Sequence, residues 1–565
     1  MKLIFKLTLI SLSIFLNRIS LTSDKIEWPD YPGIPGGKNK FIQVDGMLLK
    51  TPNGKPFIIK GIALGNHVWS NPQTSERFTH HGPDDFARIK SMGFNSVRFY
   101  LNYGLFENDS KPYIYKQSGF DWIDKNIAAA RKHGIYIVLN MHVPQGGFQS
   151  NGNGDELWTN PECRARLTAL WKEIAKRYSN EDIIIGYGLL NEPVPNKSCE
   201  QWKDLAQQIT DAVRSVDTNH ILFIERVNWL KFASSPSDRE NMYFPEIKDP
   251  APKKNIIYEY HAYSPIEFTH QNASWIPLFK NKFAVYPDSS RINAEGETWL
   301  GFSEGNPEAG SGSFEWKTLI SNNVKPIKKE YKIGKPVIQV QNIGRSGKLW
   351  IDEITIEEFN SAGKKIKTIT SSIDGDKGWH FWSRNNSGKI SSESNIDGAV
   401  TGNCLTASGT TDDAVATLDS LKFIINNGST YRISGKVKGS NIQKGAIVRF
   451  RIDYYGCDLV YSWNKDGLKA IVDEYIRFSK KRNVPLYLGE FGVYADTFRE
   501  NRGGERWLSD MLDILTAGKI NYNYHTYHES GFGIFMNDDH EFPNPDYLNK
   551  TVVNIFASKQ KVKPH

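Results

Sequence analysis

Two glutamates in this sequence each lie within or directly after a short apolar segment. Glu192 follows the segment Ile183–Asn191 and precedes Pro193, while Glu490 lies within Pro485–Val493. Two carboxyl groups in different environments can cleave an acetal, because one attacks the anomeric carbon while the other protonates the leaving oxygen. The attacking group must stay ionised, and the other must hold a proton near neutral pH.

Other residues suited to such a reaction also accompany apolar segments. Arg98 and Tyr263 could keep a carboxylate ionised, because a positive charge and a hydrogen bond both favour the charged form. The amide of Asn191 is suited to a sugar 2-hydroxyl, a contact that strengthens in the transition state. We expect the same site to include His142, His261, His525, Trp158 as a sugar-stacking platform, and Trp69, with His67, as part of the cleft lining.

Several of these residues also have a purely structural interpretation. Glu225 and Glu259 are further strand carboxylates, which we interpret as packed, hydrogen-bonded core groups. His142 and His261, taken singly, are each compatible with a core histidine. We find no third ligand at a suitable spacing beside these two histidines, so we predict no metal and no cofactor.

The elements that must position these residues alternate between apolar strands and amphipathic helices. This alternation predicts a (β/α)8 TIM barrel of eight parallel strands, in which the C-terminal ends of the strands carry the active site. Glu192 and Glu490, on the fourth and seventh strands, would then face each other. The predicted strands are 57–66, 95–102, 136–144, 183–191, 221–227, 255–263, 485–493 and 521–529, and the helices are 82–92, 120–133, 160–178, 200–216, 466–481, 505–516 and 545–556.

The segment 290–457 interrupts this rhythm after the sixth strand. It is rich in Gly, Ser, Asn and Thr and contains short runs of alternating polarity, which predict an all-β sandwich. We therefore expect barrel segments at 24–289 and 458–565 with a separate inserted domain between them.

Composition sets limits on the function. The chain has 565 residues, enough for two or three domains, and its 15 Trp, 25 Tyr and 30 Phe favour sugar-stacking surfaces, although most of these rings belong to the core. The net charge of +7 is spread along the chain, so we expect no nucleic-acid partner. We expect a monomer.

The N-terminus has the pattern of a secretory signal peptide, predicted at 1–23. Lys2 and Lys6 precede the apolar run Leu7–Leu16, which is too short to span a membrane. An uncleaved anchor is the alternative. We expect a secreted, extracellular protein with no membrane partner once the signal is removed.

Four cysteines suit an oxidising compartment. Three pairings are possible, of which we favour Cys163–Cys199 with Cys404–Cys457, because each pair then falls inside one predicted domain.

The motifs together resemble a known family. GYGLLNEP at Gly186–Pro193 and LYLGEFG at Leu486–Gly492 resemble the cellulase-like glycoside hydrolase family 5 of the retaining clan A. The resemblance extends to VRFY (Val97–Tyr100), NMHVP (Asn140–Pro144) and EYHAYSP (Glu259–Pro265). It implies that Glu192 is the acid/base and Glu490 the nucleophile, with Arg98, His142, Asn191, His261 and Tyr263 binding substrate.

One position departs from this family. Many members carry a Trp at the end of the eighth strand, where this chain has His525 within Asn523–His528. The identity of the sugar held there is therefore left open.

The predicted insertion has a resemblance of its own. Its runs Gly347–Phe359 and Thr430–Gly439 resemble strands of jelly-roll carbohydrate-binding modules, in the reverse of the usual order. Candidate stacking residues are Trp350, Trp379 and Trp382, each of which is also compatible with a core position, and Asp374 and Asp376 could join a structural calcium site.

These observations lead us to expect a secreted retaining β-glycosidase, endo-β-glucanase or mannanase-like, acting on a β-linked polysaccharide or glycoconjugate. A non-catalytic carbohydrate-binding protein and a transglycosylase that uses the same residues are the alternatives.

Overall fold

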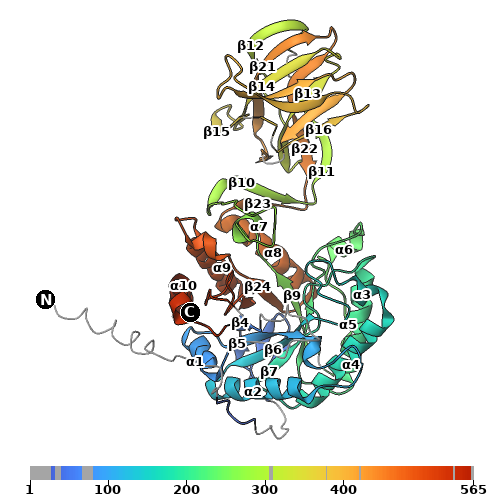
Figure 1. The fold of residues 1–565 in the computed structure, drawn as a ribbon, viewed down its shortest axis with the longest axis vertical. Coiled ribbons are helices and arrows are strands. Elements are labelled where there is room, and N and C mark those ends of the chain that lie inside the picture. Colours follow the sequence, from blue (N-terminus) through green and yellow to red (C-terminus); the bar gives the residue numbers. More distant parts are fainter. Residues whose placement is uncertain are drawn as a thin grey trace, which may run out of the picture. The chain divides into compact units, whose positions relative to one another are not determined.

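The fold is described from a computed structural model (Figure 1). It covers residues 27–31, 40–65, 81–252, 254–303, 309–373, 375–376, 378–418, 421–538 and 541–560. The predicted signal peptide, His67, Trp69 and Asp374 lie outside these residues. The chain divides into two compact units, one within 1–287 and 464–565 and the other at Asp288–Trp463. The insertion predicted at 290–457 falls within the second unit.

Runs of apolar residues form eight strands that close into a parallel barrel, which confirms the predicted fold class. Parallel strands are covered on both sides, so they are apolar along their length. In the order in which they pair around the barrel, they are β24 (Leu486–Phe491), β25 (Asn521–Tyr524), β4 (Lys60–Leu64), β5 (Ser96–Asn102), β6 (Tyr136–Val143), β7 (Ile184–Gly188), β8 (Ile221–Glu225) and β9 (Ile256–His261).

Helices follow most of these strands, and local sequence signals explain where they begin and end. Asn160 caps α4 by accepting a hydrogen bond from the Glu162 N–H, and Pro161 supplies its first turn. Gly134 ends α2 in the left-handed conformation that glycine favours. The helices are α1 (Pro83–Ser91), α2 (Gln117–His133), α3 (Asp155–Thr159), α4 (Pro161–Tyr178), α5 (Cys199–Arg214), α6 (Pro236–Glu240), α7 (Ile266–Thr269), α8 (Lys465–Arg482), α9 (Gly504–Gly518) and α10 (Lys550–Gln560).

An apolar cluster fills the barrel interior toward the N-terminal ends of the strands. It includes Ile185, Phe223 and Ile257, together with Leu49 from a small sheet of β1 (Gln43–Asp45), β2 (Leu48–Lys50) and β3 (Pro56–Phe57). Because this end is packed with apolar side chains, the polar residues of the strands gather at the other end.

The second unit is a sandwich of two antiparallel sheets. One pairs in the order β11 (Thr298–Phe302), β22 (Ile447–Gly456), β13 (Ile333–Gln341), β19 (Ala414–Leu418) and β16 (Trp379–Ser383), with β20 (Phe423–Ile424) beside β13. The other pairs in the order β12 (Gly312–Ile320), β21 (Thr430–Ile442), β14 (Lys348–Phe359), β18 (Asn403–Ser408) and β17 (Lys389–Ser394), with β15 (Lys365–Ser372) beside β14. Their inner faces share one apolar core.

A two-stranded ribbon carries the chain into this unit and out again. β10 (Asp288–Glu295) pairs antiparallel with β23 (Leu459–Trp463), and Asp288 lies opposite Trp463. The entry and exit points of the insertion are therefore neighbours, which allows a large insertion within one loop of the barrel.

The predicted disulfides are wrong for this structure, in which all four cysteines are free. Cys163 lies on α4 beside Glu156, whereas Cys199 begins α5 beside Asp238. Cys404 is in β18 and Cys457 follows β22, so these two belong to opposite sheets of the sandwich. Neither pair is brought together by the fold.

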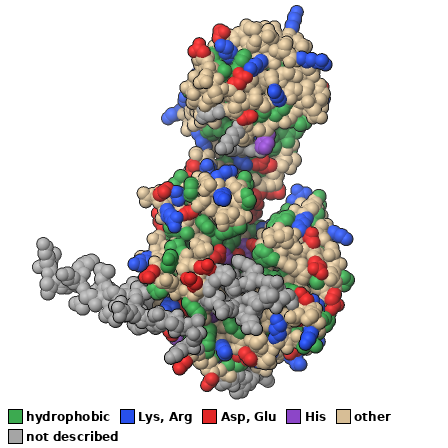
Figure 2. All heavy atoms as spheres, in the orientation of Figure 1, with side chains coloured by type: hydrophobic (Ala, Val, Ile, Leu, Met, Phe, Trp, Pro, Cys, Tyr) green, Lys and Arg blue, Asp and Glu red, His purple; other side chains and the backbone are tan. Residues whose placement is uncertain are grey.

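Positive and negative side chains are interspersed over the face of the molecule drawn in Figure 2. Among the described residues, no helix combines the length and apolarity needed to cross a membrane.

Candidate active site

A cleft of about 1560 Å³ opens among the loops that follow the barrel strands. Both glutamates singled out by the sequence line it, and His142, His261, Tyr263 and His525 join them. The other lining residues of interest are Tyr103, Phe148, Ser150, Asn228, Trp229, Trp275, Glu529 and Phe532.

Glu490 is held at the end of β24 by hydrogen bonds from Arg98 and Tyr263. The Arg98 guanidinium donates from Nη1 to Oε1 at 2.8 Å, and the Tyr263 hydroxyl donates to Oε2 at 3.0 Å. Both carboxylate oxygens are therefore engaged, which fixes the orientation of the group toward the cleft.

The charges around Glu490 keep it ionised. Burial by itself raises the pKa of a carboxyl group, but the positive charges of His261, His525 and Arg98 outweigh burial and hold the pKa of Glu490 well below its usual range. Such a group remains a carboxylate throughout the neutral pH range.

Glu192 lies in the loop after β7, where its backbone has a φ of 44°, in the left-handed region that non-glycine residues seldom adopt. Its N–H donates to Glu225 Oε2 at 2.9 Å. Its side-chain Oε1 lies 2.9 Å from His261 Nδ1. The strained backbone is thus held by a buried carboxylate, and it directs the Glu192 side chain into the cleft.

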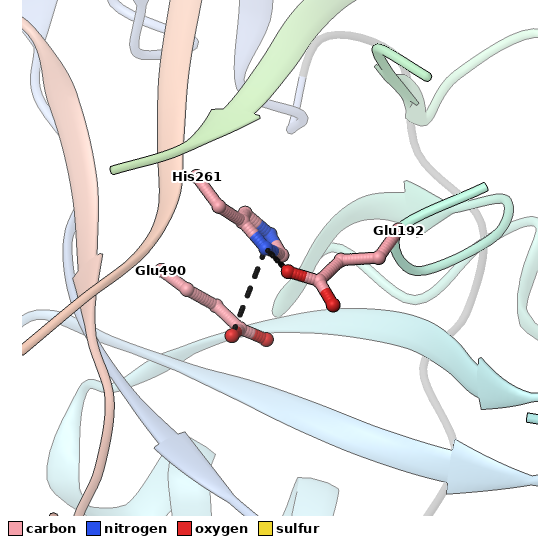
Figure 3. Close-up of side chains that lie close together, drawn as sticks. All are labelled: Glu192, His261 and Glu490. Atoms are coloured by element: carbon pink, nitrogen blue, oxygen red, sulfur yellow. Dashed lines mark hydrogen bonds and ion pairs between the residues drawn. The ribbon is translucent and has the colours of Figure 1, made fainter. Parts of the chain in front are cut away.

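His261 lies between the two glutamates (Figure 3). The same Nδ1 that contacts Glu192 is 3.6 Å from Glu490 Oε2. Burial lowers the pKa of His261, but Glu225, Glu490 and the hydrogen bond to Glu192 together raise it well above its usual value. The imidazole therefore places a positive charge beside Glu490 and holds Glu192 by a hydrogen-bond contact.

The two glutamates are close enough to act on one bond. One ligand atom each from Glu192, His261 and Glu490 all lie within 4.8 Å of one another, as do such atoms of Glu225, Glu259 and His261. Judged by distance alone, either set of three side chains could hold a metal ion. Spacing along the sequence did not reveal these sets, because their members come from different strands. In both sets the carboxylates already face His261 or Arg98 as cationic partners.

A buried layer beneath the cleft orients these groups. Arg98 Nη2 lies 2.8 Å from Glu259 Oε1 and donates to Asn191 Oδ1 at 3.0 Å. The Asn191 amide in turn donates to Ser150 Oγ at 3.3 Å. Glu259 is buried, and so is Glu225, whose pKa is raised well above its usual range chiefly by burial.

The position of Arg98 corrects one sequence expectation. The barrel prediction places the active-site residues at the C-terminal ends of the strands, whereas β5 continues to Asn102 and Arg98 lies within it. Its long side chain reaches Glu490 from deeper in the barrel.

His142 and His525 form an aromatic wall with Tyr100. The His142 ring stacks on Tyr100 at 4.0 Å between centroids, and the Tyr100 hydroxyl lies 2.9 Å from His525 Nδ1. His525 Nε2 is 3.3 Å from Glu529 Oε2. Burial lowers the pKa of His525, but Glu529 and Glu490 raise it above its usual value.

The aromatic platforms of the cleft differ from the prediction. Trp158 is buried, and its indole N–H donates to Gln149 Oε1 at 2.8 Å, so it supports a loop instead of offering a free face. Trp229 and Trp275, which line the cleft, are 41% and 54% exposed. Both follow strands, but which loop residues turn toward a cleft is decided by the loop fold and not by spacing.

The sequence matches the model of the family described as Cellulase (glycosyl hydrolase family 5) over residues 51–335, just over half of the chain. Endoglucanase C of Acetivibrio thermocellus is 32% identical over 205 residues, which cover 36% of this chain and 57% of that protein. Cellodextrinase A of Ruminococcus flavefaciens is 27% identical over 227 residues, 39% of this chain and 62% of that one.

The matched region spans somewhat more than half the length of these curated relatives. Among solved structures, Thermotoga maritima Cel5A in complex with cellobiose is 17% identical, covering 88% of this chain and 97% of that chain with a TM-score of 0.45. Because the model of this family matches more than half of the chain, the chain belongs to the cellulase family of glycosyl hydrolases, family 5.

Proposed function

We propose that this protein is a secreted retaining β-glycosidase that hydrolyses a β-linked glucan, with Glu490 as nucleophile and Glu192 as acid/base. The observation that carries the proposal is that one carboxyl oxygen of Glu192 and one of Glu490 lie within 4.8 Å of each other in one cleft, which is too close for the inverting arrangement. Retaining enzymes hold their two carboxyl groups about 5–5.5 Å apart, whereas inverting enzymes need about 6.5–9.5 Å to admit a water molecule.

In the first step, an oxygen of the Glu490 carboxylate attacks the anomeric carbon, and the glycosidic C–O bond breaks. The proton of the Glu192 carboxyl passes to the leaving oxygen, which departs as an alcohol. Arg98 and Tyr263 support this assignment, because their hydrogen bonds hold Glu490 ionised and aimed at the cleft.

In the second step, a water molecule attacks the anomeric carbon and gives its proton to the Glu192 carboxylate. The bond to Glu490 then breaks, and its carboxylate returns to Arg98 and Tyr263. Two displacements at one carbon restore the original configuration, so the product keeps the β-anomeric form.

Asn191 and His261 would position the substrate and the acid. Arg98 holds the Asn191 amide oxygen, which leaves the amide nitrogen directed toward Ser150 at the cleft wall. We propose that this amide group contacts the sugar 2-hydroxyl. His261 keeps Glu192 in place through its 2.9 Å contact.

The substrate class rests on the cleft and on the relatives. Exposed Trp229 and Trp275 offer ring faces on which pyranose rings can pack. An endoglucanase and a cellodextrinase among the relatives favour a glucan over the other β-linked glycans. The proposal of secretion rests on the N-terminal sequence pattern alone.

The test is hydrolysis of a panel of soluble β-glucans, mannans and aryl β-glycosides by the wild type, Glu490→Ala and Glu192→Ala, with the first-formed anomer observed by NMR. We expect the wild type to release a β-anomeric product and Glu490→Ala to release no product. Glu192→Ala should retain activity only on aryl glycosides with good leaving groups. An α-anomeric first product, or full activity in both variants, would refute the mechanism.

A further inference from the structure

The outer face of one sheet in the sandwich has an unusual composition. Along β13 and β22, alternate residues such as Ile338 and Phe450 enter the apolar core. The residues between them therefore point to the opposite side. The outward set consists of Trp299 and Phe302 on β11, Arg449, Arg451, Asp453 and Tyr455 on β22, Lys335, Val337 and Gln339 on β13, Val415 and Thr417 on β19, and His380 and Trp382 on β16.

The strand register arranges this set in rows that run across the sheet. Arg449, Gln339, Val415 and Trp382 are direct neighbours in one row. Another row contains Trp299 opposite Tyr455. Trp382 and Trp299 thus lie on the two edge strands, and the face between them spans four strand spacings, about 19 Å.

Aromatic rings are exposed at both edges of this face. Trp299 is 52% exposed and Trp382 is 53% exposed. The Trp299 indole N–H donates to Asp453 Oδ2 at 2.9 Å, which fixes the orientation of its ring. Next to it, Phe302 has the Arg451 guanidinium 4.1 Å from its ring centroid. Leaving large rings in water is unfavourable, and fixed exposed rings are typical of binding surfaces.

Polar side chains that bond to one another occupy the face between the two edges. Arg451 donates to Asp453 at 2.7 Å, and Arg449 donates to Gln339 Oε1 at 2.8 Å. The Gln339 amide donates onward to Gln341 at 3.0 Å. Lys335, Gln339, Arg451 and Asp453 are each less than one-tenth exposed although they point away from the core. Polar groups held this firmly are ordered before any ligand arrives.

The charged groups of this face are largely engaged by one another. Lys335 and Lys422 both pair with Glu297, Arg451 pairs with Asp453, and Arg449 donates to the Gln339 amide oxygen. The small excess of positive charge that remains falls short of the roughly 6–10 phosphate contacts that a nucleic-acid site makes. The face suits instead an uncharged ligand that can exchange hydrogen bonds with amides and guanidinium groups and can pack on indole rings.

We propose that this outer face of the β11–β22–β13–β19–β16 sheet binds an uncharged glycan chain. Sugar rings pack on Trp299 and Trp382 at the two edges, and their hydroxyl groups bond with the polar network between them. This is a second glycan site, formed entirely by residues of the inserted unit, whereas the cleft is lined by residues of the barrel unit.

The structure distinguishes this face from the other tryptophans of the insertion. Trp379 is buried. Trp350 belongs to β14 in the opposite sheet, where its indole N–H donates to Glu393 at 2.6 Å and Lys348 lies over its ring. Trp350 therefore provides a matched control: a tryptophan of the same sandwich that lies outside the proposed site.

The test is affinity electrophoresis of the full chain through gels containing a soluble polysaccharide. The parent protein carries Glu490→Gln, so that the polymer is not degraded. Uncharged probes are a mixed-linkage β-glucan and a glucomannan, a choice that rests on the proposed function, and charged probes are polygalacturonate and DNA. The variants are the double substitution Trp299→Ala/Trp382→Ala, the control Trp350→Ala, and Trp229→Ala in the cleft.

We expect at least one uncharged probe to retard the parent, and the double variant to bind it at least about tenfold more weakly. Trp350→Ala should bind like the parent. When the two tryptophan substitutions are made in the protein that keeps Glu490, this variant should hydrolyse a small aryl β-glycoside at the wild-type rate. Because both removed rings are more than half exposed, the fold should be unchanged, as circular dichroism can verify.

Three results would overturn the proposal: equal binding by parent and double variant, retardation by the charged probes alone, or no retardation by any probe. The outcomes for the two proposals are separable. Binding that depends on Trp299 and Trp382 without hydrolysis by the wild type refutes only the proposed catalytic function. If the wild type hydrolyses the glycan but binding is lost only in Trp229→Ala, the proposal of a second glycan site is refuted and the proposed catalytic function is not.

Discussion

Glu490 and Glu192 have the same side chain but different surroundings. Glu490 accepts hydrogen bonds on both oxygens from Arg98 and Tyr263, whereas Glu192 has its contact with one imidazole. The surroundings of Glu490 hold it in the ionised form that a nucleophile requires, which leaves the role of the acid to Glu192. The donors around Glu490 are therefore the first place to test the assignment.

Tyr263→Phe removes the 3.0 Å hydrogen bond to Glu490 Oε2. A hydrogen bond to a charged group contributes about 1.5–3 kcal/mol, so kcat/KM should fall by roughly 10- to 150-fold. Steady-state kinetics on an aryl β-glycoside measures the effect. Tyr260→Phe is the control, because the buried Tyr260 hydroxyl has no hydrogen-bond partner among the described residues. Equal losses in the two variants would contradict the role of the Tyr263 hydroxyl.

His525 is the residue at which this chain departs from many members of its family, and its charge depends on Glu529. Glu529→Gln removes the negative charge that raises the pKa of His525. The folded-state pKa of His525 should therefore fall, so that the ring loses its proton at a lower pH. Because His525 is one of the cations that lower the pKa of Glu490, the pKa of Glu490 should rise in the variant.

The measurement is an NMR titration of the His525 ring together with kcat/KM as a function of pH. We expect the His525 titration to move to lower pH in Glu529→Gln, and any decline in activity linked to loss of its proton to move with it. Glu500→Gln is the control, because Glu500 is exposed and pairs with Arg502 away from the cleft. An unchanged His525 titration would show that Glu529 does not control its charge.

At the scale of elements, the end of β24 shows why a glycine precedes the proposed nucleophile. A Cβ added to Gly489 would lie 1.8 Å from Glu259 Oε1. Glu259 is the partner of Arg98, which in turn holds Glu490. The two strands can approach closely enough to form this chain of contacts only because position 489 has no side chain.

Gly489→Ala should therefore act on catalysis through the buried layer. Displacing Glu259 shifts Arg98, and overpacking of this kind costs about 1–3 kcal/mol of folding free energy. We expect a lower midpoint of urea unfolding and a loss in kcat with little change in KM. Wild-type kinetics with a wild-type unfolding midpoint would mean that Glu259 and Arg98 do not depend on this close approach.

The barrel elements were predictable because their signals are local. Buried parallel strands are runs of branched apolar residues, as in β8 (Ile221–Glu225), and α4 carries its own cap and a clear apolar face. The helices α3, α6 and α7, of four or five residues each, were not predicted, since elements this short have too few turns to show a period.

The site was predictable in part for a related reason. Glu192 and Glu490 accompany strands, so the barrel itself brings them together. Trp229 and Trp275 belong to loops, whose course depends on contacts far along the chain. Trp158 illustrates the converse: it has the residue type of a platform, but its hydrogen bond to Gln149 turns it into a loop support. The predicted cysteine pairings were wrong. For Cys404 and Cys457, membership of one domain did not reveal that their strands belong to opposite sheets.

At the scale of the whole molecule, the insertion divides the sequence of the barrel without dividing its structure. β9 precedes the insertion and β24 follows it, yet the two strands pair directly in the closed barrel. The barrel must therefore form this contact across the whole length of the inserted unit. The β10–β23 ribbon makes that possible, because it brings the two ends of the insertion side by side.

This arrangement predicts that the insertion can be removed. Asp288 and Trp463 are paired residues, so their Cα atoms lie about 4.5–5.5 Å apart, and a short Gly-Ser linker can join Pro287 to Asn464. The shortened protein should fold with a cooperative unfolding transition, because the loop to be closed between β9 and β24 becomes shorter. It should hydrolyse aryl β-glycosides, since every residue that we place in the active site lies in the barrel unit.

The same deletion should remove the binding that depends on Trp299 and Trp382. In polysaccharide gels, the shortened Glu490→Gln protein should therefore migrate like the full-length protein that also carries both alanine substitutions, after correction for size. Joining the chain between Ser91 and Ser96 instead, which deletes the residues linking α1 to β5, is the contrasting control and should abolish folding. If the shortened protein were folded but inactive on small aryl glycosides, the insertion would have to contribute to the catalytic site itself, and the assignment of all catalytic groups to the barrel would be wrong.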